Sequence, residues 1–411
     1  MLPSLPQEVL EHILDSNVLT NSDLFRCSLV SHAFLEGSRR SLYHWFTFGH
    51  LCETDEGQPS LRFSTAGVQL QAIRDAPELA KLVRAIQLPP DGPGTREEDL
   101  GNALKEVLEL CPGVDWLRFD KMSAELVPAI SLATRGRSLR MLEVGDLNIH
   151  TWGLLVEHPE IKHIACAGGA MFAGTLPPTD AQLPSFSLTS LSILGFSIFT
   201  VFASNHGTLR RTFSDLVHSS RGSLRSLTIP YQLDIVGDLS AFPHLRHLNL
   251  SCKTGTSWAA LTELFIDMDI LGLPDPKTCA DELVAFLSTG RSLEMVVLGF
   301  DSHTSPITLD ELFTHDRLVR ALPSVTRIHF THPDELDMAW LISLVCSPFS
   351  SHVREIGLCT KKYDGERRGA MPATAEMVAM ARVCETRGVE LVEAEKLWFG
   401  ASLWCFALAD Y

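Results

Sequence analysis

The residues that could bind a metal or catalyse a reaction are scattered singly along this chain. His329 and His332 are neighbours in sequence, but the next cysteine, Cys346, completes no spacing that is typical of a metal site. No GxSxG, HExxH or phosphate-binding glycine loop occurs, and Glu97 and Glu98 lie where a helix start is expected, where carboxylates complement the helix dipole. The sequence therefore predicts no catalytic residues, no metal and no cofactor, and a non-catalytic protein that acts by binding.

Charge and hydropathy limit the classes of partner that this chain is expected to bind. The chain has 50 Asp and Glu against 34 Lys and Arg, a net charge of -16, which repels the phosphates of nucleic acids. Its apolar stretches are shorter than the roughly 18 residues of a membrane span, and Glu8, Glu11 and Asp15 interrupt the apolar N-terminus, unlike a signal peptide. We therefore expect a cytoplasmic or nuclear protein with reduced cysteines and protein partners, which binds neither nucleic acid nor membranes.

The N-terminal segment predicts three short helices. Ser4 and Gln7 have the spacing of a capping box at the start of the first, Thr20 and Asp23 repeat it before the second, and Ser31 is suited to cap the third. Three helices of this length enclose too little apolar surface to be stable alone. They are therefore expected to pack on a larger fold or on a partner.

The same segment resembles the F-box motif. The resemblance lies in Leu5-Pro6-x-Glu8-Val9-Leu10, Ile13-Leu14, Asp23-Leu24 and Leu29-Val30-Ser31-x-x-Phe34, although His32 stands where the family usually has Lys or Arg. In that family the helices bind a Skp-type adaptor of a cullin-based ubiquitin ligase, which implies that residues 1–50 bind such an adaptor and, through it, a cullin. An ordinary helical cap on a larger fold is the alternative. The implied adaptor-binding residues are Leu5, Pro6, Val9, Leu10, Ile13, Leu14, Leu24, Cys27, Leu29, Val30 and Phe34.

The rest of the chain repeats a short spacing, apolar-x-x-apolar-x-apolar, at irregular intervals. The sets that begin at Tyr43, Ile161 and Val389 fit the spacing least well. The full series is Tyr43/Phe46/Phe48, Val83/Ile86/Leu88, Val114/Leu117/Phe119, Leu139/Leu142/Val144, Ile161/Ile164/Cys166, Leu188/Leu191/Ile193, Leu224/Leu227/Ile229, Leu245/Leu248/Leu250, Leu293/Val296/Leu298, Val325/Ile328/Phe330, Val353/Ile356/Leu358 and Val389/Val392/Ala394.

This spacing resembles the leucine-rich repeat, in which a short strand carries the apolar core and a helix returns outside it. The resemblance implies an α/β fold, a right-handed superhelix with a curved parallel sheet, over residues 51–395, closed by an apolar C-terminal segment, 396–411, that caps the last repeat. An F-box before irregular leucine-rich repeats is similar to F-box proteins abundant in mushroom-forming (basidiomycete) fungi. The helices expected between strands are Glu98–Leu110, Thr208–His218, Trp258–Ile270, Asp281–Leu287, Asp334–Val345 and Thr374–Cys384.

Strand geometry then predicts a binding surface. Successive residues of a strand face opposite sides, so the residues beside each inward apolar position should lie on the concave face. Trp, Met and Arg are common in protein-binding hot spots, but each of these residues could equally be an idle solvated strand residue. The predicted target-binding row is Trp116, Arg118, Met141, Glu143, His163, His247, Asn249, Met295, Val297, Arg327, His329 and Glu355.

The predicted function is that of a substrate receptor of an SCF-type cullin–RING ubiquitin ligase, which holds an adaptor with its N-terminal helices and a target protein with its repeats. An interaction scaffold outside any ligase is the second hypothesis, and an enzyme that uses the concave face is the third. If the row is an exposed recognition surface, glutamate at Trp116 or Met295 should remove target binding without unfolding the protein.

Overall fold

The computed structural model describes fifteen parts of the chain, from the second expected N-terminal helix to the last strand. The N-terminal 20 residues and the C-terminal segment lie outside the described residues. The described residues are 21–30, 32–48, 65–88, 97–119, 126–145, 149–166, 182–193, 206–229, 236, 238–250, 284–299, 322–331, 338–347, 351–359 and 375–393.

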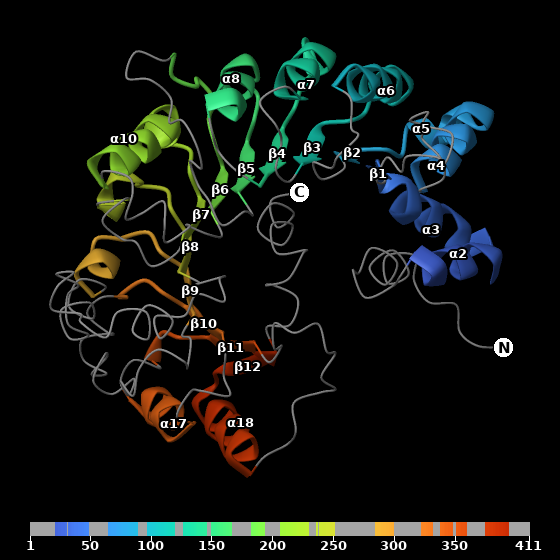
Figure 1. Cartoon of the computed structure of the whole chain (residues 1–411). Helices are drawn as coiled ribbons and strands as arrows, with labels where there is room; N and C mark the ends of the chain where they lie inside the picture. Colours follow the sequence, from blue (N-terminus) through green and yellow to red (C-terminus); the bar gives the residue numbers. More distant parts are fainter. Residues whose placement is uncertain are drawn as a thin grey trace, which may run out of the picture. The chain divides into compact units, whose positions relative to one another are not determined.

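The chain forms two compact units. The first comprises Met1–Gly168 and Phe172–Phe186, and the second comprises Gly169–Met171 and Ser187–Tyr411. In the first unit, helices lie along one side of a row of strands (Figure 1). Its elements in chain order are α2 (Asn21–Val30), α3 (His32–His44), β1 (Trp45–Thr47), α4 (Thr65–Asp75), α5 (Pro77–Ala80), β2 (Ala85–Gln87), α6 (Glu97–Leu110), β3 (Trp116–Phe119), α7 (Leu126–Thr134), β4 (Met141–Val144), α8 (Ile149–Glu157) and β5 (His163–Cys166).

The second unit continues the alternation of strands and helical turns. Its strands pair in chain order, each parallel to the one before it. Its elements are β6 (Ser190–Ile193), α10 (His206–Val217), the 3-10 helices η1 (His218–Ser220) and η2 (Leu239–Ala241), β7 (Ser226–Ile229), β8 (His247–Leu250), β9 (Met295–Gly299), β10 (Arg327–Thr331), α17 (Met338–Cys346), β11 (Glu355–Cys359), α18 (Ala375–Arg387) and β12 (Glu390–Glu393).

The predicted apolar spacing coincides with the strands, and this confirms the α/β fold of parallel strands and helices. Within each unit, from β1 to β5 and from β6 to β11, the middle apolar residue of one set pairs with the middle residue of the next, so that one apolar side chain per strand lies buried in register with its neighbours. The sets at Tyr43 and Ile161, which fit the spacing least well, also form strands. The buried register residues are Phe46, Ile86, Leu117, Leu142 and Ile164 in the first unit, and Leu191, Leu227, Leu248, Val296, Ile328 and Ile356 in the second.

The predicted register of β12 is wrong by one residue. The spacing predicts Val392 as the middle apolar residue, but Leu391 pairs with Ile356 and Glu393 pairs with Leu358. Leu391 and Val392 are adjacent apolar residues, and Val389 precedes them beyond Glu390, so the sequence offers two alternations. The preceding turn decides between them: Gly388 has a positive φ of 68°, and Val389 is buried beside it.

The expected helices are present wherever the structure describes the corresponding residues. α6 begins one residue before the predicted Glu98 and buries Leu104, Val107 and Leu108, an i, i+3, i+4 set that faces the strands. α10, α17 and α18 lie over the segments predicted around Thr208–His218, Asp334–Val345 and Thr374–Cys384. A short helical stretch at 284–288 overlaps Asp281–Leu287, and the predicted helix Trp258–Ile270 lies outside the described residues.

Backbone hydrogen bonds extend the ladder one residue beyond the strands. At several strands the preceding residue donates its N–H to the carbonyl oxygen of the equivalent residue in the previous repeat, as Arg140 does to Asp115 at 2.7 Å and Lys162 to Arg140 at 2.8 Å. In the second unit Arg246 donates to Arg225 at 2.9 Å, and Glu294 to Arg246 at 2.8 Å. These bonds fix the spacing of adjacent repeats, and with it the positions of the side chains on both faces of the strands.

Candidate functional site

The helices α2 and α3 pack against each other and form the first candidate binding site. Leu24 lies in the core, whereas Cys27 and Phe34 are partly buried. Leu29 and Val30, at the end of α2, are 71% and 73% exposed. The structure thus leaves two adjacent large apolar side chains uncovered in the segment predicted to bind an adaptor. The other predicted residues of that site, Leu5, Pro6, Val9, Leu10, Ile13 and Leu14, lie outside the described residues.

The predicted target-binding row of the first unit is brought together across three strands. Trp116 on β3 pairs in register with Met141 on β4 and then with His163 on β5, while Arg118 pairs with Glu143. The Arg118 Nε and the Glu143 Oε1 are 3.4 Å apart in an ion pair. The register therefore makes these members of the row neighbours on adjacent strands, and the row is continuous within this unit.

The exposure expected for this part of the row is wrong. Trp116, Met141 and Glu143 are buried, and only Arg118 and His163 are partly exposed. Adjacent parallel strands lie about 4.8 Å apart, so long side chains on the same face cover one another. Trp116 lies 4.1 Å from the Trp45 ring, centroid to centroid, and 6.4 Å from that of His44.

The second unit brings together two further parts of the row. His247, Met295, Arg327 and Glu355 stand in register across β8 to β11. Asn249, Val297 and His329 form the parallel line two residues further along the strands. Asn249, Met295, Val297 and His329 are buried, which corrects the expectation of an exposed row, whereas His247, Arg327 and Glu355 are partly exposed.

His329 has the most constrained polar environment in this part of the row. Its Nε2 lies 2.6 Å from Oε1 of Glu355, and its ring packs against Gly357, where an added Cβ would meet the ring at 2.5 Å. Burial lowers the pKa of His329, while Glu355 acts in the opposite direction. The neutral imidazole therefore donates Nε2–H to the carboxylate, and its Nδ1, like Oδ1 of buried Asn249, has no hydrogen-bond partner in the structure.

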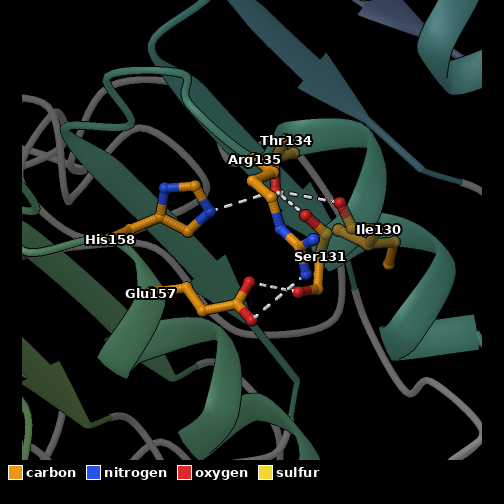
Figure 2. A network of polar contacts seen from close by, with 6 residues as sticks. All are labelled: Ile130, Ser131, Thr134, Arg135, Glu157 and His158. Carbon is orange, nitrogen blue, oxygen red and sulfur yellow. Dashed lines mark hydrogen bonds and ion pairs between the residues drawn. The ribbon is translucent and has the colours of Figure 1, made fainter.

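A polar network between α7 and α8 is a feature that the sequence analysis missed. Figure 2 shows the side chain of Thr134 directed at His158. The Thr134 Oγ1 is 3.0 Å from His158 Nε2 and donates to the carbonyl oxygen of Ile130 at 2.9 Å. Beside them, Glu157 accepts a hydrogen bond from Ser131 and forms a 3.9 Å ion pair with Arg135.

This network joins two successive repeats. Thr134 and His158 are buried, and burial lowers the pKa of His158. The two residues belong to consecutive helix ends, a relationship that only the repeat register reveals. Among the described residues, no group of three or more His, Cys, Asp or Glu side chains could hold a metal ion.

Comparisons with known proteins find likeness only among solved structures. No protein-family model and no curated protein sequence matches the chain. Among solved structures, the crystal structure of the leucine-rich repeat-containing protein LegL7 from Legionella pneumophila is similar, with 14% identity and a TM-score of 0.37, over 75% of this chain and 82% of that one. Support for a repeat architecture therefore comes from the strand order and register of this chain. None of the described helices is long and apolar enough to cross a membrane.

Proposed function

We propose that this protein is the non-catalytic substrate receptor of an SCF-type cullin–RING E3 ubiquitin ligase. The N-terminal helices bind a Skp-type adaptor, which in turn binds the cullin, and the repeat units bind a target protein. The observation that carries the proposal is the exposed pair Leu29 and Val30, within the segment that resembles the F-box motif. Contiguous apolar side chains in water indicate a protein-docking surface.

The burial of the strand row changes which residues are proposed to touch the target. Trp116, Met141, Glu143, Asn249, Met295, Val297 and His329 are buried, so we assign them to support of the strand face. The partly exposed members of the row carry the contacts in this proposal. They are all polar, which favours a target that presents charged or hydrogen-bonding groups. They are Arg118, His163, His247, Arg327 and Glu355.

A receptor of this kind accelerates ubiquitin transfer by proximity. Holding a target beside the ubiquitin-carrying enzyme converts an encounter between two molecules into a reaction within one complex. The bond chemistry belongs to that enzyme, so the receptor itself needs no catalytic group. Such a complex acts in the cytoplasm or the nucleus, and the arrangement resembles that of F-box proteins from mushroom-forming fungi.

Adaptor binding tests the proposal. The double variant Leu29→Glu/Val30→Glu should reduce capture of a purified Skp-type adaptor about 10-fold or more, because it places two charges in an apolar contact. The matched control is Leu132→Glu on α7, where the leucine is equally exposed at 68% but lies outside α2 and α3. Undiminished capture by the double variant would refute the assignment of this surface.

Cullin binding separates the receptor from a scaffold that acts outside a ligase. Affinity purification of the full chain should recover adaptor, cullin and target proteins together, and loss of adaptor binding should increase the abundance of those targets. Recovery of protein partners without adaptor or cullin would favour the scaffold. In that case the repeats would still bind a partner, but no ubiquitin transfer would depend on the chain.

A further inference from the structure

The helices α17 and α18 pack against each other, and each carries one cysteine (Figure 1). Cys346 is the last residue of α17 and is exposed, whereas Cys384 on α18 is buried. Nη2 of Arg387 donates a hydrogen bond to the carbonyl oxygen of Cys346 at 3.2 Å. Cys384 and Arg387 are three residues apart in one helix and therefore share a face. The bond thus brings the Cys384 face of α18 against the end of α17.

The electrostatics of the two thiols agree with this proximity. Burial raises the pKa of Cys384, and the neighbouring Cys346 raises it further. Cys346 also occupies a favourable position for a small adjustment, since the last residue of a helix can shift without breaking the hydrogen bonds of the preceding turns.

We propose that Cys346 and Cys384 form an oxidation site for peroxides that closes into an intramolecular disulfide. Exposure makes Cys346 the residue that the oxidant reaches, and its position beside α18 makes Cys384 the resolving residue. A disulfide requires Cα atoms roughly 4.4 to 6.8 Å apart, so closure brings the Cα atoms of Cys346 and Cys384 to that separation. The product links α17 to α18 and fixes two successive repeats of the second unit.

The chemistry balances with hydrogen peroxide as the oxidant. The Cys346 thiolate attacks one peroxide oxygen and the O–O bond breaks, which gives a sulfenic acid on Cys346 and, after protonation, one water. Cys384 loses its proton, and its thiolate attacks the Sγ of Cys346. The S–O bond breaks, and the departing hydroxide takes up that proton as a second water. Two thiols lose two electrons in total, and the peroxide gains them.

Peptide mapping of the intact protein tests this site. The full chain is treated at pH 7.4 with hydrogen peroxide, free thiols are blocked, and tryptic peptides are analysed without reduction. Residues 328–354 contain Cys346 as their only cysteine and residues 383–387 contain only Cys384, so the linked pair has a unique mass. The peptide 106–118, with the buried Cys111, is the internal control and should stay unlinked.

Variants decide the order of the steps. Cys346→Ser should abolish the linked mass, and Cys384→Ala should leave a sulfenic acid on Cys346 that dimedone traps. Three results overturn the proposal: no linked mass in the wild type, linkage of Cys346 to a different cysteine, or direct oxidation of Cys346 to sulfinic acid while Cys384 stays reduced. The measurement uses neither adaptor nor target, so its failure leaves the proposed receptor function unaffected.

Discussion

Trp45 and Trp116 meet across an intervening strand. Their ring centroids are 4.1 Å apart with the planes at 62°, although the residues belong to β1 and β3. Ala85 of β2 pairs in register with both and is fully buried. The small side chain of Ala85 leaves the space above β2 that the two indole rings fill. Trp116 is consequently 4% exposed and belongs to the packed structure of the first unit.

We therefore expect Trp116→Ala to lower the free energy of unfolding by about 3 kcal/mol or more, because it removes a buried aromatic side chain and leaves a cavity. Urea unfolding followed by circular dichroism measures the change. Trp116→Phe, which keeps an aromatic ring, should cost less. The burial of Trp116 replaces the expectation from the sequence that glutamate at this position leaves the fold intact. A Trp116→Glu variant with wild-type stability would contradict the structural role and support the original expectation.

Ala85→Leu tests the contact between Trp45 and Trp116 by changing the residue on the strand between them. A leucine at this position places a branched side chain in the space that Trp45 and Trp116 occupy, and overpacking of this kind costs about 1 to 3 kcal/mol. The melting temperature of the protein should fall. Unchanged melting, with unchanged near-ultraviolet dichroism of the tryptophans, would show that the two rings do not depend on Ala85.

Gly357, like Ala85, leaves space for a neighbouring ring, in this case the ring of His329. A Cβ at Gly357 would meet Cγ and Cδ2 of His329 at 2.5 Å, so Gly357→Ala should displace the ring and weaken the hydrogen bond to Glu355. We expect a loss of about 1 to 3 kcal/mol in unfolding free energy. The matched control is Gly153→Ala in α8, where nothing lies within 4 Å and alanine should be neutral or mildly stabilising. Equal stability of both variants would contradict the contact.

Acidification should destabilise the protein through its buried histidines. Burial lowers the pKa of His158 below its ordinary value of 6.5, so below that pH the unfolded chain binds a proton that the folded chain does not. Stability due to this residue is complete above pH 6.5 and falls as the pH decreases toward the folded-state pKa. His158→Gln should therefore flatten the decline of melting temperature between pH 7 and 5. A decline identical to that of the wild type would exclude His158 as a contributor.

The sequence was sufficient to locate the strands because each one needs a buried apolar residue at the same register position, as Leu117 and Leu142 show. It could not determine which outward residues stay exposed, because burial there depends on neighbours one repeat away. Trp116 is covered because Ala85 is small, and His329 is covered because its neighbour in the next repeat is Gly357. In β12, adjacent Leu391 and Val392 left the alternation undetermined.

The contact between Thr134 and His158 was hidden for the same reason. The residues are 24 positions apart and follow no local spacing. Their relationship becomes visible only once the strands are aligned, since each then lies at the end of the helix before its strand. Leu29 and Val30 illustrate the opposite case, because they lie in a segment that local capping spacing predicts to be helical, and α2 ends at Val30.

The last prediction concerns the folding of the N-terminal helices, which we expect to require the strands that follow them. α3 ends at His44 and β1 begins at Trp45 without a linker, and the His44 carbonyl oxygen accepts a hydrogen bond from Arg84 N at 3.0 Å. Phe46 and Phe48 are buried in the first unit. A fragment of residues 1–50 would expose both rings, so we expect it to aggregate or lack cooperative unfolding, whereas residues 1–186 should fold. Size-exclusion chromatography and thermal unfolding compare the two fragments. A monomeric, cooperatively folded 1–50 fragment that binds the adaptor as well as the full chain would show that the helices need no support from β1.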